Sequence, residues 1–288
     1  MAFRTVVVKT RAKIETRLGY LVIRSDEDSW IFINEINTLI IESASTVITC
    51  QALLELSKNN VNVVFCNEKH LPYGQLMLFN ANFNTSGNIK SQTLWEQERK
   101  ESLWQQIIYQ KLFWQEKVLL KHGKTSAANI INEYIYQILP NDKTNREGHA
   151  AKVYFNALFG MNFSRRDENI EKNSALNYAY AILMSAVARE ISACGYSNHI
   201  GIWHDNQFND YNLACDLMEP FRPIIDDFVL SINTDDFKTE ASKILSIKLK
   251  IGKREFYLDS AIELFVRSAS RYMKKEVEEI IKIEGYEI

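Results

Sequence analysis

The 288-residue chain has few of the residues that define several common protein classes. Its four cysteines are Cys50, Cys66, Cys194 and Cys215, and none forms a C-x-x-C pair, which argues against a zinc ribbon or a thioredoxin-type site. We expect them to be small buried residues of a protein in a reducing compartment. Only 10 glycines and 4 prolines leave little room for long flexible linkers.

Long apolar runs and a strong excess of one charge are also missing. No stretch approaches about 18 consecutive apolar residues, so no transmembrane helix is expected. Residues 1–8 lack the apolar core of a signal peptide. The formal net charge is −2, whereas nucleic-acid-binding domains are typically basic. We therefore expect a cytoplasmic protein with no membrane partner, in which any nucleic-acid surface is a local patch.

The chain does contain ample material for a hydrophobic core. Hydrophobic residues make up 46% and aromatic residues 11%, which excludes a disordered chain. Short β-branched and apolar runs recur about every ten residues in the first third and predict a small sandwich. These runs are residues 4–10, 20–23, 30–33, 39–41 and 61–66, and residues 46–56 are expected to form a helix.

The pattern changes after residue 76. The polar, asparagine-rich stretch 80–92 predicts a linker or mobile loop, and helical spacing begins at Thr93. Residues 174–191 are apolar on nearly all sides, as in a central buried helix. A hairpin is expected over 247–258 and a closing helix over 262–283. The predicted fold is α+β: a β-sandwich-like domain (1–76), a linker (77–92) and a mainly α-helical domain (93–288).

One candidate site lies around His204. A helix is expected to start after Asn209 or Asp210 as N-cap, which would place Asp216 and Glu219 on the same helix face. Two carboxylates on one face repel each other unless a cation or a shared proton lies between them. A solvated helix face explains the same spacing, so the pattern alone leaves both interpretations open.

A second candidate site lies around Glu147. Thr144 and Glu147 have the spacing of a capping box, with Thr144 as N-cap. Gly148 is unusual in the first turn, where glycine costs about 1 kcal/mol relative to alanine. Close approach of another helix or of a ligand would explain it.

Taken together, the two segments resemble the CRISPR-associated spacer-acquisition integrase/endonuclease family, most closely its type II-A members. The resemblance covers essentially the whole chain in the right order. Its most specific part is Asp-Leu-Met-Glu-Pro-Phe-Arg-Pro at residues 216–223. Asn-Arg-Glu-Gly-His-Ala-Ala at 145–151 and His-x-Asn-Gln-Phe-Asn at 204–209 also match, as do the opening Arg-Thr-Val-Val-Val and the late Tyr257-Leu258.

The resemblance implies a β-rich domain for dimerisation and DNA contact, followed by a helical catalytic domain. It implies that Glu147, His204 and Glu219 bind a catalytic Mg²⁺ or Mn²⁺, the ions that suit two carboxylates and one imidazole. Asp216, one turn before Glu219, would assist through a water or from behind the ligands.

Two further side chains are expected near this site. Arg222 would fix a carboxylate or contact phosphate, and a plain intrahelical ion pair explains its spacing equally well. His149 lies two residues after Glu147 and would point elsewhere on the helix, so we assign it a packing or supporting role.

The implied reaction inserts short foreign DNA, the protospacer, into the CRISPR array. A 3′-hydroxyl attacks the phosphodiester at the leader-repeat boundary, assisted by the metal ion. The implied partners are double-stranded DNA, a second copy of the chain, and a small ferredoxin-like adaptation protein that completes a heterohexamer. A type II-A accessory ring protein and an effector nuclease are further expected partners.

The basic stretch 4–24 is the candidate for DNA backbone contact. It carries six basic residues and one acidic residue, a side-chain charge of +5, and includes Arg4, Lys9, Arg11, Lys13 and Arg17. A solubilising strand face explains the same residues. For the whole protein, the alternatives are a non-catalytic DNA-binding scaffold of the spacer-capture complex and a metal-dependent nuclease unrelated to CRISPR arrays.

Overall fold

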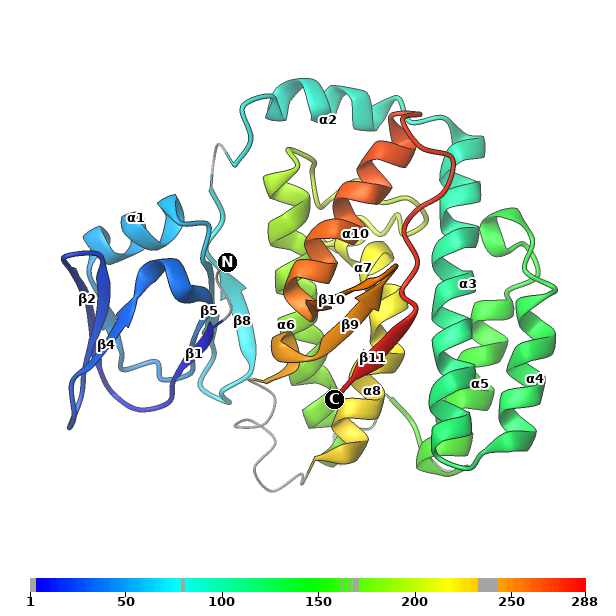
Figure 1. The fold of residues 1–288 in the computed structure, drawn as a ribbon, viewed down its shortest axis with the longest axis horizontal. Helices are drawn as coiled ribbons and strands as arrows, with labels where there is room; N and C mark the ends of the chain where they lie inside the picture. The colour runs from blue at the N-terminus through cyan, green and yellow to red at the C-terminus, as the bar shows by residue number, and fades with distance from the viewer. Residues whose placement is uncertain (1–3, 79–80, 162, 166, 168–170, 233–242) are drawn as a thin grey trace.

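The computed structural model describes residues 4–78, 81–161, 163–165, 167, 171–232 and 243–288 (Figure 1). Residues 79–80, within the predicted linker (77–92), lie outside these ranges. The strands are β1 (Arg4–Val8), β2 (Lys13–Arg17), β3 (Tyr20–Arg24), β4 (Ser29–Phe32), β5 (Ile36–Ile41), β6 (Val47–Ile48), β7 (Asn62–Cys66), β8 (Pro72–Gln75), β9 (Lys248–Ile251), β10 (Arg254–Tyr257) and β11 (Gly285–Glu287).

The helices lie mostly in the second part of the chain. They are α1 (Cys50–Lys58), α2 (Thr85–Thr93), α3 (Gln97–Lys121), α4 (Thr125–Ile135), α5 (Arg146–Phe159), α6 (Glu171–Ala193), α7 (Asn212–Met218), α8 (Arg222–Ser231) and α10 (Leu258–Met273), with short 3-10 turns η1 (Ile33–Glu35), η2 (Pro140–Asp142), η3 (Glu219–Phe221) and η5 (Ile244–Ser246). The α+β class with an N-terminal sandwich and a mainly helical remainder is confirmed. Within the described residues, no helix has the length and apolarity needed to span a membrane.

The N-terminal part consists of two packed sheets. One has the strand order β1-β5-β7-β8, with β1, β5 and β7 parallel and β8 antiparallel; the other has the order β4-β3-β2-β6. The predicted strands are present, and β2, β6 and β8 are additions that the apolar pattern did not reveal. Ile14 and Leu21 from one sheet meet Leu39 and Val63 from the other in a shared core.

The first sheet faces two cores at once. On β5, Leu39 points into the sandwich, whereas its neighbour Ile40 belongs to the helical core, and Val63 and Val64 on β7 divide in the same way. This follows from the two-residue period of a strand. The central strands therefore read as continuous apolar runs, because neither face is exposed to water.

Helix α6 forms the centre of the helical part, as predicted. It lies behind the sheet β10-β9-β11, with α10 beside it and the group α3, α4 and α5 farther from the sandwich (Figure 1). Leu176, Leu183 and Val187 on α6 are fully buried. Apolar residues on all sides of this helix thus reflect packing from all sides.

Two predictions at the edges of the helical part were wrong. The asparagine-rich stretch contains a helix, α2, which lies across the top of the molecule in Figure 1. Its amide side chains bond the backbone of a distant loop: Asn88 donates to the Cys194 carbonyl (2.9 Å), and Gln92 donates to the carbonyls of Ser197 (2.9 Å) and Ile200 (2.8 Å). Long-range side-chain bonds of this kind give no local sequence signal.

The closing helix ends earlier than predicted. Helix α10 stops at Met273, and Lys275 adopts a left-handed φ of 62°. The Glu276 N–H bonds the Arg271 carbonyl (2.9 Å) and the Lys275 N–H bonds the Tyr272 carbonyl (3.0 Å), which is a Schellman ending without its usual glycine. The chain then returns as β11, so the predicted hairpin β9–β10 belongs to a three-stranded sheet.

The cysteines are less buried than expected. Cys50 is exposed, and Cys66, Cys194 and Cys215 are half-buried; all four are free thiols.

Buried polar contacts join the two parts of the molecule. The Tyr178 hydroxyl on α6 donates to the Glu42 carboxylate just after β5 (2.8 Å), and the Asn62 amide on β7 donates to the Ser185 hydroxyl (3.0 Å). Glu42 is only 3% exposed. A buried carboxylate of this kind depends on its hydrogen-bond donors.

A first prediction tests this junction. Tyr178→Phe removes a donor from the buried Glu42 carboxylate and is expected to lower the free energy of unfolding by about 1–3 kcal/mol. Urea unfolding of the variant against wild type measures it, with the exposed Tyr73→Phe as control. Equal stability of all three proteins would contradict the assigned contact.

A second contact of this type connects α6 to α8. The Tyr180 hydroxyl donates to the Asp226 carboxylate, and both residues are buried. Burial raises the pKa of Asp226 to about 6, against the opposing effects of the Tyr180 hydrogen bond and of the nearby Arg222 and Arg165.

The raised pKa of Asp226 predicts a pH dependence of stability. Because the folded pKa lies above the unfolded one, the folded state holds the extra proton between about pH 4 and pH 6. Stability relative to Asp226→Asn is therefore expected to fall by about 2–3 kcal/mol as the pH rises through this window. Urea unfolding of both proteins at several pH values measures the difference, with the exposed Asp205→Asn as control. A difference independent of pH would contradict the assignment.

Candidate active site between α3, α5 and the α7–α8 turn

Glu147 lies at the start of α5, which is capped differently from the prediction. The N-cap is Asn145 rather than Thr144, in a left-handed conformation (φ 51°), and its side chain accepts from the Gly148 N–H (3.3 Å). Asp142 accepts from the first two backbone N–H groups of the helix, at 2.8 and 2.9 Å. The Glu147 side chain therefore does not cap the helix, and it extends toward α3.

Gly148 serves this cap. A Cβ at this position would lie 2.7 Å from Asn145 Oδ1, closer than a carbon atom can approach without displacement. The expectation that another helix or a ligand approaches Gly148 was thus wrong, because the close neighbour is the cap of its own helix.

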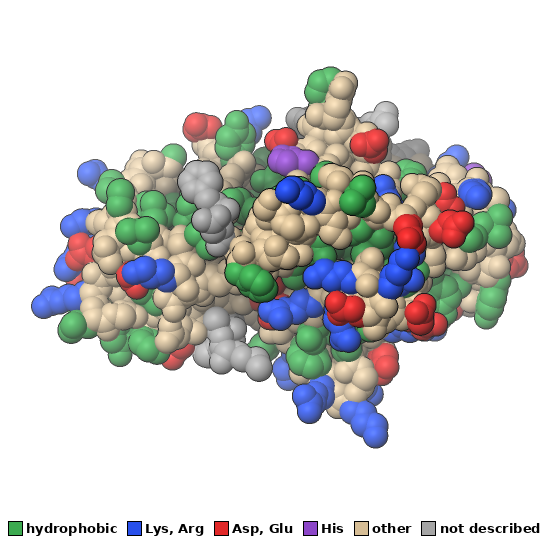
Figure 2. All heavy atoms as spheres, turned by 90° about the horizontal axis from the view of Figure 1, so that it is seen from above, with side chains coloured by type: hydrophobic (Ala, Val, Ile, Leu, Met, Phe, Trp, Pro, Cys, Tyr) green, Lys and Arg blue, Asp and Glu red, His purple; other side chains and the backbone are tan. Residues whose placement is uncertain are grey.

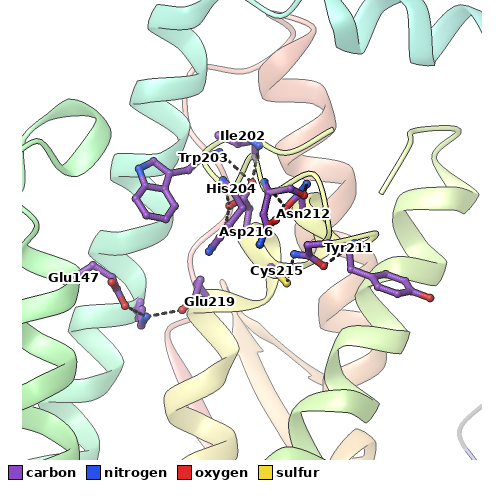
Figure 3. A network of polar contacts seen from close by, with 12 residues as sticks. Glu147, Ile202, Trp203, His204, Tyr211, Asn212, Cys215, Asp216 and Glu219 are labelled. Carbon is purple, nitrogen blue, oxygen red and sulfur yellow. Dashed lines mark hydrogen bonds and ion pairs between the residues drawn. The ribbon is translucent and has the colours of Figure 1, made fainter. Parts of the chain in front are cut away.

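Asp216 holds the loop that carries His204. It is fully buried on α7, and its carboxylate accepts from the backbone N–H groups of Ile202 (2.6 Å), Trp203 (3.1 Å) and His204 (3.1 Å) (Figure 3). The same carboxylate lies 2.6 Å from His204 Nδ1. Since a carboxylate accepts, Nδ1 carries the hydrogen, and in the neutral imidazole Nε2 keeps its lone pair.

The charge of Asp216 also affects the proton affinity of His204. Burial opposes protonation of the imidazole, but the hydrogen bond and charge of Asp216 outweigh it and raise the His204 pKa. A carboxylate behind a histidine in this way fixes the tautomer and orients the ring. Asp216 is thus placed to support His204 rather than to reach an ion itself.

Gly201 makes this loop possible, a residue that the sequence analysis did not single out. A Cβ there would lie 2.2 Å from the His204 carbonyl oxygen and 2.8 Å from Asp216 Oδ2. The tight turn over the carboxylate therefore excludes any side chain at position 201.

Asp216 and Glu219 lie in two adjacent helical segments, α7 and η3, rather than in one helix. Helix α7 begins at Asn212, after Tyr211 rather than after Asn209 or Asp210 as cap, and ends at Met218. Glu219 begins the 3-10 turn η3 with Pro220 next to it. Asp216 contacts the His204 loop, and Glu219 contacts Lys111 on α3 (Figure 3).

Lys111 on α3 is the residue that brings the two glutamates together. Its ammonium forms ion pairs with Glu147 and with Glu219 Oε2, at 2.6 Å from the latter (Figure 3). Arg222 donates to the other oxygen of Glu219 (2.7 Å). The Lys111 and Glu219 side chains are 7% and 5% exposed, so these charges interact with little solvent screening.

The cations control the ionisation of Glu219. Burial alone would raise the pKa of this carboxyl, but Arg222 and Lys111 lower it to about 2. Sequence reasoning missed Lys111. The sequence feature that could have identified Lys111 is its position in the apolar stripe of α3. It lies four residues after the buried Ile107 and directly before the buried Leu112.

The donor groups of this site suit a divalent cation. As the side chains stand, no three His, Cys, Asp or Glu residues in the described part of the chain close around one point. However, Glu147 and Glu219 already converge on one cation, the Lys111 ammonium. Glu219 Oε2 is buried and contacts the Lys111 ammonium, and His204 Nε2 faces away from Asp216. Two carboxylates and one imidazole are donors that fit Mg²⁺ or Mn²⁺.

Two other predicted site residues, Arg222 and His149, each lie against a tyrosine ring. Arg222 combines the expected i,i+3 ion pair with a position 4.6 Å above the Tyr180 ring. His149 is exposed and packs against the Tyr134 ring (6.2 Å), as a packing role requires. Trp203, 47% exposed and missed by sequence reasoning, stacks on the buried Trp104 (5.0 Å).

The basic N-terminal stretch is partly neutralised. Arg4 pairs with Glu35 (3.2 Å), while Lys13 (2.7 Å) and Arg24 (2.8 Å) share Glu15. On the face shown in Figure 2, blue side chains at the left, N-terminal end have red neighbours. Lys9, Arg11 and Arg17 are exposed as well.

Comparisons with known proteins agree with this architecture. The family model for CRISPR associated protein Cas1 matches residues 5–255. A CRISPR-associated endonuclease Cas1 of Neisseria meningitidis is 31% identical, covering 93% of this chain and 91% of the relative. A Cas1 endonuclease of Francisella tularensis is 25% identical, covering 85% and 86%.

Solved structures show the same fold. A CAS1 protein from Thermotoga maritima superposes with a TM-score of 0.77 at 15% identity, covering 95% of this chain and 98% of that one. A casposase bound to integration product gives a TM-score of 0.76 at 19% identity, covering 97% and 92%. With a family model matched over most of its length and a relative aligned almost end to end, the chain belongs to the Cas1 family of CRISPR-associated proteins.

Proposed function

We propose that the protein is a metal-dependent DNA integrase and endonuclease of CRISPR adaptation, which inserts protospacers into the CRISPR array. The observation that carries the proposal is the convergence of Glu147 and Glu219 on one buried cation position beside His204. The names of the relatives, which are endonucleases, support the nuclease activity. The casposase, solved with an integration product, supports strand transfer on this fold.

In this proposal the 3′-hydroxyl of the protospacer attacks the leader-repeat phosphodiester and a 3′-oxygen leaves. One phosphodiester replaces another, so no high-energy cofactor is consumed. A bound Mg²⁺ or Mn²⁺ supplies Lewis acidity and makes a coordinated hydroxyl more acidic. Glu147, Glu219 and the Nε2 of His204 would hold the ion.

The surrounding residues prepare these ligands. Arg222 keeps Glu219 ionised and fixes one of its oxygens. Asp216 holds the proton on His204 Nδ1, so that Nε2 faces the site as a lone-pair donor. The buried surroundings of Glu219 exclude water, which strengthens the electrostatic contacts.

The proposed partners follow from this proposed function. They are double-stranded DNA, a second copy of the chain joined through the N-terminal domain (1–76), and a small ferredoxin-like adaptation protein in a heterohexamer. A solved Cas6-RT-Cas1–Cas2 complex contains a chain of this fold, with a TM-score of 0.75. Arg4, Lys9, Arg11, Lys13 and Arg17, which are all exposed, remain our candidates for backbone contact.

A non-catalytic DNA-binding scaffold is the second candidate function. It is favoured by one observation: Lys111 and Arg222 already balance the charge of the two glutamates, so the fold needs no metal ion to keep them together. The two functions differ in whether removal of a glutamate abolishes DNA joining.

An integration assay distinguishes them. The purified protein and its small partner would be given a labelled duplex with free 3′-hydroxyls and a leader-repeat plasmid, with Mg²⁺, Mn²⁺ or chelator. We expect joining to require the metal and to fall at least about 100-fold in Glu147→Gln, because one anionic ligand is lost. The exposed Glu133→Gln is the matched control. Full joining by Glu147→Gln would support the scaffold.

A further prediction concerns Asp216. Asp216→Asn removes the charge behind His204 and is expected to lower the His204 pKa in the metal-free protein and to reduce joining about 10–100-fold. In wild type, the raised His204 pKa stabilises the fold at low pH, and this contribution is lost as the pH rises through the folded pKa. NMR titration of His204 measures the shift, with the exposed Asp210→Asn as control. An unchanged His204 titration would contradict the assigned pair.

A further inference from the structure

The ammonium of Lys111 stands where the proposed function requires a divalent ion. It contacts the carboxylates of both Glu147 and Glu219, which come from α5 and η3 (Figure 3). A lysine is attached to its helix by a flexible four-carbon stem, so its charged end can move while its backbone stays fixed. Glu147 and Glu219 therefore face a cation that belongs to the chain itself.

A second position for this ammonium exists next to the first. A cavity of about 280 Å³ is lined by Lys111 and by Gln115, which lies one turn further along α3. Gln115 is 2% exposed, and its Oε1 has no hydrogen-bond partner among the described residues. A buried amide oxygen without a donor is costly, and an ammonium is the strongest donor within reach.

The other charged walls of the cavity are one carboxylate and two guanidinium groups. Asp226 supplies a carboxylate. Of the two guanidinium groups, Arg222 is paired with Glu219, and Arg165 donates to the amide oxygens of Asn173 (2.6 Å) and Asn177 (2.8 Å). Gln115 Oε1 and Asp226 are thus the acceptors available to Lys111 on this side.

We propose that Lys111 is a tethered counter-ion that alternates between two positions. Without metal, its ammonium holds Glu147 and Glu219 together; when a divalent ion binds, the ammonium moves to Gln115 Oε1 in the adjacent cavity. This inference rests on the proposed function, because it takes the glutamates to be metal ligands. Lys111 is then a positioning residue: it keeps the ligands assembled and sets the metal concentration at which the site fills.

The exchange has a measurable consequence for metal affinity. When a competing group occupies a site, the apparent dissociation constant rises by the inverse of the fraction of molecules in which the site is open. Lys111→Met keeps the apolar stem and removes the competitor, so we expect Mn²⁺ to bind at least about tenfold more tightly. Gln115→Leu removes the alternative position and is expected to weaken Mn²⁺ binding by about threefold or more while leaving the metal-free contacts intact.

The experiment is a titration of the full-length protein with Mn²⁺ alone, followed by electron paramagnetic resonance of the free ion. The variants are Lys111→Met, Gln115→Leu, Glu147→Gln to identify the site, and Lys117→Met as a control on the same helix. Thermal unfolding in chelator and in Mn²⁺ gives a second readout. We expect Lys111→Met to melt below wild type in chelator and to gain more from Mn²⁺ than wild type does.

The outcomes separate this inference from the proposed function. Mn²⁺ binding that depends on Glu147 but is equal or weaker in Lys111→Met would overturn the counter-ion role and leave the metal site standing. Unchanged binding in Gln115→Leu would overturn the second position. If neither wild type nor Lys111→Met shows Mn²⁺ binding that depends on Glu147, the metal-dependent function itself is contradicted, and this inference with it.

Discussion

The mutual repulsion of two neighbouring carboxylates, the buried Glu219 and the half-buried Glu147, is the constraint around which the candidate site is organised. Glu147 and Glu219 come from separate segments, and the buried Glu219 would be costly without a compensating charge. Lys111 and Arg222 provide the compensating charge, and each is itself held by a packed helix. The long helix α3 thus contributes the cation as well as much of the apolar core.

Asp216 is another buried carboxylate in the same region, and it is stabilised in a different way. It is satisfied by three backbone N–H groups and an imidazole rather than by a lysine or an arginine. The two arrangements make different demands on the surroundings. Glu219 needs side chains that come from other elements, whereas Asp216 needs a loop that folds closely over it, which is why Gly201 is required.

The sequence predicted those features that repeat or that depend on near neighbours. Alternation and apolar runs located most strands, and the all-round apolar surface of α6 located the central helix. The resemblance to a family located Glu147, His204 and Glu219, whose roles remain proposals. Local rules failed where two neighbouring polar residues fit the same role. Thr144 and Asn145 are both suitable N-cap residues, and only the folded structure shows that Asn145 is the cap.

Other features were out of reach because their causes are distant in the sequence. Lys111 is recognisable as functional only when Glu147 and Glu219 are seen against it. The end of α10 was missed because Lys275 takes the left-handed position that usually belongs to glycine. Helix α2 is stabilised by bonds to a loop about a hundred residues away, as with Asn88 and the Cys194 carbonyl.

The sheet that faces two cores sets a limit on dissecting this protein into fragments. A cut between β8 and α2 would leave Val7, Ile40 and Val64 uncovered on one product and the sheet-facing side of α6 uncovered on the other. Both fragments would expose contiguous apolar surface, the feature that drives isolated pieces to aggregate. The N-terminal residues look like a separable module along the sequence, but they are one wall of the core that surrounds α6.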